Sequence, residues 1–372
     1  MEADLSHPME DGTNPPKPLD AGALFVLKSR GSWWHCGYHL TTSIVAPALL
    51  SLPFALSLLG WVAGVFCLTM AALVTFYSYN LLSVVLEHHA HLGQRQLRFR
   101  DMARDILGPG WGRYFVGPIQ FGLCYGAVIA CILLGGQSLK FIYLLSRPNG
   151  TMQLYQFVII SGVLMLVLAQ IPSFHSLRHI NLVSLVLCLS YSASATAGSI
   201  YIGHSKTAPV KNYSVHGSGE HRLFGALNAI SIIATTYGNG IIPEIQVYLQ
   251  PTNEVLEQKF ADPKIDQFSV RNVVPRLAFR SLSVVIATTL AAMFPFFGDI
   301  NAVIGAFGCI PLDFILPMIF YNVTFKPSKQ SLIFWGNTLL AVIFSILGAL
   351  GAISSIRQII LDANTYSFFA NI

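Results

Sequence analysis

Charged residues are scarce in this sequence: aspartate, glutamate, lysine and arginine together make up 10% of its 372 residues. Soluble domains carry about 25%. Hydrophobic residues make up 53%, so a water-soluble fold would have too few polar side chains to cover its surface. This shortage of charge argues against a soluble enzyme, a nucleic-acid-binding protein and a disordered protein.

The sequence also lacks paired cysteines and the common catalytic motifs. Its six cysteines contain no CxxC pair and five lie inside apolar segments, so we interpret them as small packing residues rather than disulfide or metal-binding residues. The histidines His88, His89 and His91 follow an apolar segment and enter a basic loop, which favours solvated side chains over a metal site. HExxH, GxSxG and P-loop motifs are absent from the sequence. We therefore predict no enzyme, no metal and no cofactor.

What the sequence has is a series of long, continuous apolar runs. A hydrocarbon core about 30 Å thick needs about 20 apolar residues per helix. Continuous runs argue against an outer-membrane β-barrel, whose strands alternate apolar and polar residues. The sequence therefore predicts an all-α polytopic membrane protein with tails at 1–36 and 353–372. Its transmembrane domain, 37–352, would contain about nine spans, at 37–59, 61–86, 121–145, 154–171, 180–202, 223–249, 277–297, 300–321 and 331–352.

Lysine and arginine are distributed unevenly over the predicted loops. If the N-terminus is cytoplasmic, most of the 22 basic residues lie on the cytoplasmic side, as the positive-inside rule requires. With nine spans, the C-terminus would lie outside. Two N-glycosylation sequons, at Asn149 and Asn212, then fall outside the cell, whereas a third, at Asn322, falls at the inner edge and should stay unmodified.

The basic loop between the second and third predicted spans has apolar residues at helical spacing. They are Phe99, Met102, Ala103, Ile106 and Leu107. This pattern predicts a short amphipathic helix on the inner membrane surface, which we interpret as structural rather than functional.

Two of the predicted spans contain residues that interrupt a helix. The first span has Pro47 and Pro53, each of which lacks a backbone donor and obstructs a helical turn. The sixth span has Gly238, Gly240 and Pro243 within a few residues. Kinked structural helices are one interpretation. However, one such span opens each half of the chain, which is typical of inverted-repeat transporters whose broken helices bind substrate near the bilayer midplane.

Few carboxyl groups lie inside the predicted spans. Glu244 lies in the sixth span, Asp313 in the eighth, and Asp299 just before the eighth. A charged side chain at the bilayer centre costs at least about 2.5 kcal/mol, so hydrocarbon favours the neutral carboxyl, and such a group can take up and release a proton. We predict proton coupling at Glu244. Asp313 is a second candidate, with helix capping as an equal alternative, and Asp299 is expected to cap the eighth span.

Two stretches resemble the amino acid/auxin permease family. Residues 41–64, TTSIVAPALLSLPFALSLLGWVAG, are similar to its first span, and residues 238–246, GNGIIPEIQ, are similar to its sixth. The likeness runs over nearly the whole chain, including 296–321, and favours the GABA permease group of plants. It implies a leucine-transporter-like (amino acid/polyamine/organocation) inverted-repeat fold, and import of γ-aminobutyric acid (GABA) or related amino acids at the plasma membrane, driven by the proton gradient. It also implies substrate-lining residues in the two interrupted spans: Ala46, Leu49, Ser51, Thr236, Gly238 and Asn239.

The chain departs from the family plan in length, because family members resemble an eleven-span protein. After Gln246 the sequence runs directly into a segment that resembles the inner end of the eighth family span. An internal block of about two spans is thus missing, through an alternative transcript or a gene-model error, and the second repeat is incomplete. Loss of two spans keeps later segments on their original side, so we expect correct insertion but impaired transport.

The resemblance leaves two matters open. The chain could be a non-transporting isoform or regulatory membrane subunit that pairs with a full-length carrier. Within the family resemblance, the substrate could be GABA, auxin, proline or another neutral amino acid. The residues alone do not fix the oligomeric state.

Overall fold

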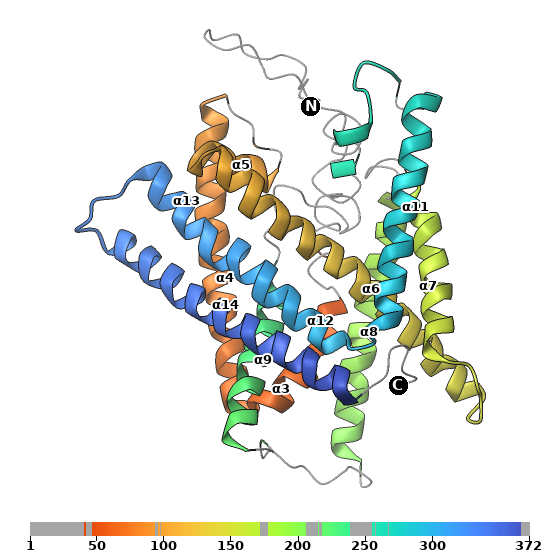
Figure 1. The fold of residues 1–372 in the computed structure, drawn as a ribbon. Helices are drawn as coiled ribbons and strands as arrows, with labels where there is room; N and C mark the ends of the chain where they lie inside the picture. The colour runs from red at the N-terminus through yellow and green to blue at the C-terminus, as the bar shows by residue number, and fades with distance from the viewer. Residues whose placement is uncertain are drawn as a thin grey trace, which may run out of the picture.

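The computed structural model describes residues 41, 47–93, 96, 98–171, 178–205, 215, 218–238, 255–256, 258–266 and 268–365. Within these ranges all regular structure is helical, as the composition predicts (Figure 1). The predicted tail at 1–36 lies outside them.

The helices follow one another with short connections. In the first half they are η1 (Pro47–Ser51), α3 (Leu52–Leu59), α4 (Trp61–His91), α5 (Phe99–Leu107), η2 (Trp111–Val116), α6 (Gly117–Ser146), α7 (Leu154–Ala169) and α8 (Arg178–His204). In the second half they are α9 (Gly219–Tyr237), α11 (Val270–Met293), α12 (Phe297–Val303), η5 (Ile304–Ile315), α13 (Leu316–Phe325) and α14 (Leu332–Thr365). The segment η1 is a 3₁₀-helix, whereas η2 and η5 are π-helical.

Six helical stretches among the described residues are long and apolar enough to cross a membrane. They are Trp61–His91, Trp111–Ser146, Leu182–His204, Val270–Met293, Phe297–Phe325 and Leu332–Asp362. Two further apolar helices, Leu49–Leu59 and Leu154–Ala169, are shorter. The sequence-based count of nine spans also included the region of α9, which ends at Tyr237. The three additional spans therefore correspond to helices that are short within the described residues.

The last helix is longer than the sequence predicts. The predicted final span ends at residue 352, whereas α14 continues to Thr365, so the predicted tail at 353–372 begins inside a helix. Polar residues after 352 suggested the end of a span. In the structure, Ser354 is 2% exposed and its hydroxyl donates to the Phe224 carbonyl of α9 at 2.6 Å. These polar residues therefore contribute to helix packing.

The helix η5 lies in the core and packs against α6, α9 and α14. Two glycines allow this close approach. A Cβ on Gly305 would lie 1.8 Å from the Ser231 carbonyl oxygen of α9, and one on Gly308 would lie 2.9 Å from Leu123 Cβ of α6. Small residues allow helices to pack closely in membranes, where no hydrophobic effect drives association.

Proline explains why η5 is π-helical. Pro311 has no N–H, and its ring would clash with the carbonyl of the residue four positions earlier. The stretch relaxes into wider turns, in which the Leu316 N–H donates to the Pro311 carbonyl. The eighth predicted span therefore continues through Asp313, which excludes the helix-capping alternative for this residue. Segments of π-helix occur frequently at functional sites.

The amphipathic helix predicted on the inner membrane surface is α5, but its apolar face contacts protein. Phe99, Met102 and Ala103 are fully buried in a core cluster with Val85 of α4 and Phe320 of α13. The spacing of these residues predicted the helix correctly. It could not distinguish burial against lipid from burial against the ends of neighbouring helices.

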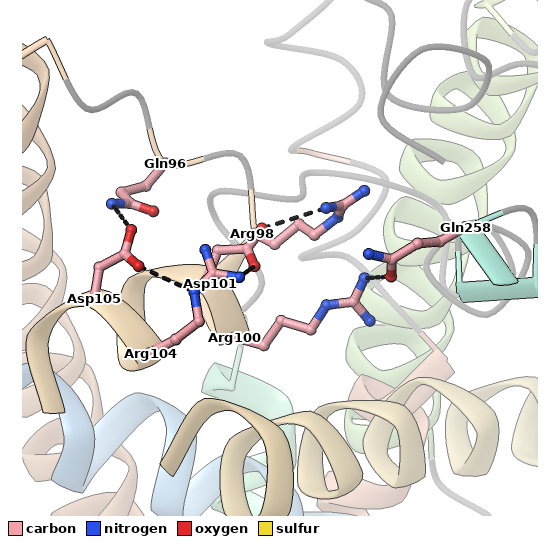
Figure 2. A network of polar contacts seen from close by, with 7 residues as sticks. All are labelled: Gln96, Arg98, Arg100, Asp101, Arg104, Asp105 and Gln258. Atoms are coloured by element: carbon pink, nitrogen blue, oxygen red, sulfur yellow. Dashed lines mark hydrogen bonds and ion pairs between the residues drawn. The ribbon is translucent and has the colours of Figure 1, made fainter. Parts of the chain in front are cut away.

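Polar side chains of α5 and its surroundings form a network (Figure 2). Gln96 Nε2 donates to Asp105 Oδ2 at 2.8 Å, and Arg104 Nε donates to Asp105 Oδ1 at 3.0 Å. Arg100 Nη2 donates to Gln258 Oε1 at 2.7 Å. The last bond connects the loop before α6 with the segment that precedes α11. Exposed pairs of this kind contribute about 0–1 kcal/mol each, so the network positions these loops more than it stabilises them.

The described sequons differ in accessibility. Asn149 is exposed in the turn between α6 and α7. Asn322 lies between α13 and α14, where Asn337 Nδ2 donates to its Oδ1 at 2.9 Å and its own Nδ2 contacts the Phe334 carbonyl at 3.4 Å. Asn212 lies outside the described residues.

Candidate functional site

The described parts of the two interrupted spans lie together. The segments η1 and α3 pack against α9, and η1 also contacts α12. Ala55 of α3 belongs to a buried cluster with Ala229 and Ile232 of α9. The helix α9 ends at Tyr237, and Gly238 has φ −75° and ψ 106°, outside the helical region. The start of one helical segment thus lies beside the end of another.

The prolines of the first span lie at helix starts. Pro47 begins η1, and Pro53 is the second residue of α3. A missing N–H is tolerated in the first turn of a helix, because that N–H has no partner within the helix. The two prolines therefore separate a 3₁₀ turn from a short α-helix instead of kinking one long helix.

Four of the predicted substrate-lining residues are described. Ser51, Thr236 and Gly238 are buried, and Leu49 is half-buried. The Thr236 hydroxyl donates to the Ile232 carbonyl in its own helix at 3.2 Å. Thr236 therefore already has a partner for its hydroxyl hydrogen. The other predicted residues in these segments lie outside the described residues: Ala46, Asn239, Gly240, Pro243 and Glu244.

Gly238 is required at its position by the close approach of η5. A Cβ at this residue would lie 2.4 Å from Cys309 Sγ and 2.5 Å from Cys309 Cβ. Real Cβ atoms essentially never approach other atoms this closely. The end of α9 is thus held directly against the π-helical segment that carries Asp313.

Asp313 is 0% exposed and is contacted by two consecutive residues of α4. The Ser78 hydroxyl donates to the Asp313 backbone carbonyl. Tyr79 Oη lies 3.4 Å from Asp313 Oδ1 and 3.1 Å from the Tyr237 carbonyl oxygen, to which it donates. One hydroxyl therefore links a buried carboxyl group to the last carbonyl of α9.

Neither Ser78 nor Tyr79 was predicted to be functional from the sequence. A signal was present, because residues 77–80, YSYN, are four consecutive polar residues in an otherwise apolar helix. On a helix, consecutive residues point in different directions, so such a run cannot be explained by one solvated face. Tyr77 hydrogen-bonds Asn337 Oδ1 at 2.6 Å, away from the end of α9.

A further polar contact connects α9 to α12 close to the same helix end. The Thr235 hydroxyl lies 2.6 Å from the Asn301 carbonyl and 3.1 Å from the Ser231 carbonyl. Asn301 Nδ2 donates to the Phe297 carbonyl at 2.9 Å. These contacts use side-chain donors to fix α9 against α12.

The prediction that Asp299 caps a helix is wrong. The helix α12 begins at Phe297, with Phe296 at the cap position and no side-chain cap hydrogen bond. Asp299 therefore lies within the first turn, where a negative charge is favoured by the helix dipole. Its side chain hydrogen-bonds Asp362 of α14.

Asp299 also lines a cavity of about 1110 Å³ between α6, η5 and α14. The other lining residues are almost all apolar, among them Ile129, Phe307 and Ile315. Such walls offer few partners to a zwitterion, which needs both donors and acceptors. The helix ends at η1 and α9 supply both, so they are the better candidate site.

Comparison with known proteins assigns the family. The transmembrane amino acid transporter protein family matches residues 29–247 and 239–361. The chain belongs to this family. It is therefore a multi-pass membrane protein that transports amino acids, and it is not an enzyme. The family resemblance noted from residues 41–64 and 238–246 is confirmed.

Three relatives of this transmembrane amino acid transporter come from Arabidopsis thaliana. GABA transporter 1 is 54% identical over 434 positions, which cover 95% of this chain and 96% of the relative. Lysine histidine transporter-like 1 is 26% identical, with 95% of this chain and 94% of the relative covered. Lysine histidine transporter-like 6 is 26% identical, with 91% and 93% covered. No solved structure matches the chain.

The alignment with GABA transporter 1 also measures a difference in length. It spans 434 positions, whereas 95% of 372 residues is about 353, so about 80 positions have no residue in this chain. The two stretches that match the family overlap at 239–247. These residues thus match the family both at the end of the first stretch and at the start of the second.

Proposed function

We propose that this transporter imports GABA or a related small amino acid across the plasma membrane, together with protons. The similarity to GABA transporter 1 supports this substrate class, because 54% identity extends over nearly the full length of both proteins. The proton gradient would supply the driving force, and the cargo would be a zwitterion.

The observation that carries the proposal is the meeting of η1 with the end of α9. The last carbonyls of a helix lack partners within the helix and carry partial negative charge, whereas the first N–H groups carry partial positive charge. The carbonyl end of α9 at Tyr237 suits a substrate ammonium group. The N–H groups of η1 and α3 suit a carboxylate. The two ends together would bind a small amino acid without a charged side chain.

Proton coupling is assigned to Asp313, with Glu244 as the other candidate. Asp313 is 0% exposed and lies one hydroxyl away from the end of α9. A carboxyl group so placed can exchange a proton while it influences the substrate. Glu244 lies outside the described residues.

The proposed fold is a leucine-transporter-like inverted repeat with nine spans, a cytoplasmic N-terminus and an external C-terminus. The discontinuous helical segments η1–α3 and α9, one in each half of the chain, support it. In this topology Asn149 and Asn212 are the glycosylation candidates.

The missing positions suggest slower transport than in GABA transporter 1. About 80 aligned positions are enough for a loop and two spans at about 20 residues per span. The second repeat would then be incomplete, and substrate exchange would be slower. The same deficit favours a second candidate function, that of a subunit that pairs with a full-length carrier without transporting.

Equilibrium binding tests the substrate assignment separately from transport. We expect the purified chain in lipid nanodiscs to bind labelled GABA saturably. Unlabelled GABA should compete better than proline or auxin. Absence of saturable binding, or stronger competition by auxin, would contradict the proposed substrate class. Co-purification with a full-length carrier without GABA binding would favour the subunit function.

A further inference from the structure

We propose that Tyr79 is a positioning residue that connects the protonation state of Asp313 to the carbonyl end of α9. The inference rests on the proposed function, because it assigns coupling between proton and substrate to one side chain. Its basis is that one hydroxyl group lies between two acceptors with different roles, 3.4 Å from Asp313 Oδ1 and 3.1 Å from the Tyr237 carbonyl.

Packing holds these three residues together. The helix α4 contacts both α9 and η5, so Tyr79 lies between the two elements it links. Ser78, which is 0% exposed, donates to the backbone carbonyl of Asp313 and fixes η5 relative to α4. On the opposite side, the contact between Gly238 and Cys309 leaves no room for a side chain at residue 238. The distances from Tyr79 are thus set by backbone packing.

The chemistry of a hydroxyl group makes the arrangement a two-state link. A tyrosine hydroxyl donates one hydrogen bond and also accepts. When Asp313 is protonated, its O–H can donate to Tyr79 Oη, and the Tyr79 O–H donates to the Tyr237 carbonyl. When Asp313 is ionised, it attracts the Tyr79 hydrogen, because bonds to a charged acceptor are about twice as strong as neutral ones. The bond to Tyr237 is then lost.

The state of the Tyr237 carbonyl affects the substrate. A carbonyl oxygen has two lone pairs, so a carbonyl held by Tyr79 can still accept a bond from a substrate ammonium group. Fixing the carbonyl in advance lowers the cost of ordering it when substrate binds. Protonated Asp313 should therefore bind GABA more tightly than ionised Asp313. A proton and a substrate that favour each other in this way are carried together.

Other titratable groups near this site do not change charge in the relevant pH range. The core cluster around Ile310 and Phe314 of η5 contains the phenols of Tyr77, Tyr237 and Tyr321. The thiols of Cys309 and of Cys124 on α6 lie close to one another, and Cys309 interacts with Asp313. Thiols and phenols stay neutral between pH 5.5 and 7.5. On α12 the carboxyl group of Asp299 contacts Asp362, and the residues that α14 contributes to the cluster are Leu340, Ala341 and Phe344.

The test compares GABA binding at pH 5.5 and pH 7.5 in nanodiscs. We expect the wild-type Kd to be about tenfold lower at pH 5.5, within the usual range of coupling between sites. Y79F should bind weakly at both pH values, near the wild-type value at pH 7.5. D313N, which resembles the protonated acid, should bind tightly at both. The double variant should behave like Y79F.

Y77F is the matched control, because it also removes one tyrosine hydroxyl from α4 but breaks a bond to Asn337. It should keep the wild-type pH dependence. If Y79F also keeps it, or if Y77F loses it equally, Tyr79 has no coupling role and the inference is wrong.

A measurement without substrate separates this inference from the proposed function. Infrared difference spectra between the two pH values record the protonated carboxyl band that D313N removes. We expect Y79F to shift the frequency of this band and Y77F to leave it in place. An unshifted band in Y79F overturns the inference. A shifted band in a protein that does not bind GABA overturns the proposed substrate and leaves the hydrogen-bond link intact.

Discussion

Replacing Gly305 by alanine is expected to destabilise the protein strongly. The added Cβ would lie 1.8 Å from the Ser231 carbonyl oxygen and 2.6 Å from Thr235 Oγ1, both in α9. Backbone atoms of a packed helix cannot move aside as a flexible side chain can. Overpacking usually costs about 1–3 kcal/mol, and a clash with a backbone carbonyl should reach or exceed the upper value. The apparent midpoint of thermal unfolding in detergent should fall, with loss of the monodisperse peak in size-exclusion chromatography.

Gly336→Ala provides the control for this prediction. Gly336 also lies in a helix, and a Cβ there would meet nothing within 4 Å. Alanine favours a helix by about 1 kcal/mol over glycine, so this variant should be as stable as the wild type or more so. If both variants unfold alike, η5 does not pack against α9 as closely as the structure shows.

Asp313→Asn is expected to abolish accumulation driven by the proton gradient. A gradient of two pH units supplies about 2.7 kcal/mol per proton, which allows about 100-fold accumulation at one proton per substrate. Asparagine resembles the protonated acid and cannot release a proton. Proteoliposomes with D313N should therefore reach the same internal level of labelled GABA with and without the gradient. Long incubation makes this endpoint independent of a slow transport rate.

Asp299→Asn is the matched variant, since Asp299 is also buried, at 4% exposure, but hydrogen-bonds Asp362 instead of Tyr79. It should keep gradient-driven accumulation. If D313N keeps it too, Asp313 is not the coupling group. Glu244→Gln would then be the variant expected to lose it.

Much of the membrane architecture can be predicted from apolar runs alone. The predicted span 61–86 falls within α4, and 154–171 nearly coincides with α7. The helix α9 ends beside Gly238, where a glycine-rich stretch makes further helix unfavourable. Hydropathy fails where polar residues are satisfied by packing. Ser354 looked like the end of a span, yet its hydroxyl bonds the Phe224 carbonyl inside the protein.

The candidate site was harder to predict, because it depends on residues far apart in the sequence. Tyr79, Tyr237 and Asp313 meet only because α4, α9 and η5 pack together. The sequence marked Asp313 as an unusual carboxyl group and Gly238 as a helix interruption, but it contained no measure of their separation. The role of Asp299 was predicted wrongly for a related reason: a carboxyl near a helix start favours capping, whereas its partner, Asp362, is contributed by α14.

Uptake of labelled GABA by the reconstituted chain tests the central claim most directly. Proteoliposomes containing this chain, or GABA transporter 1 of Arabidopsis thaliana, would be placed in an acidic medium with a neutral interior. The account predicts saturable uptake by this chain that is slower than that of the relative and is abolished by a protonophore. Uptake that does not saturate, or that continues unchanged after the proton gradient is dissipated, would contradict it.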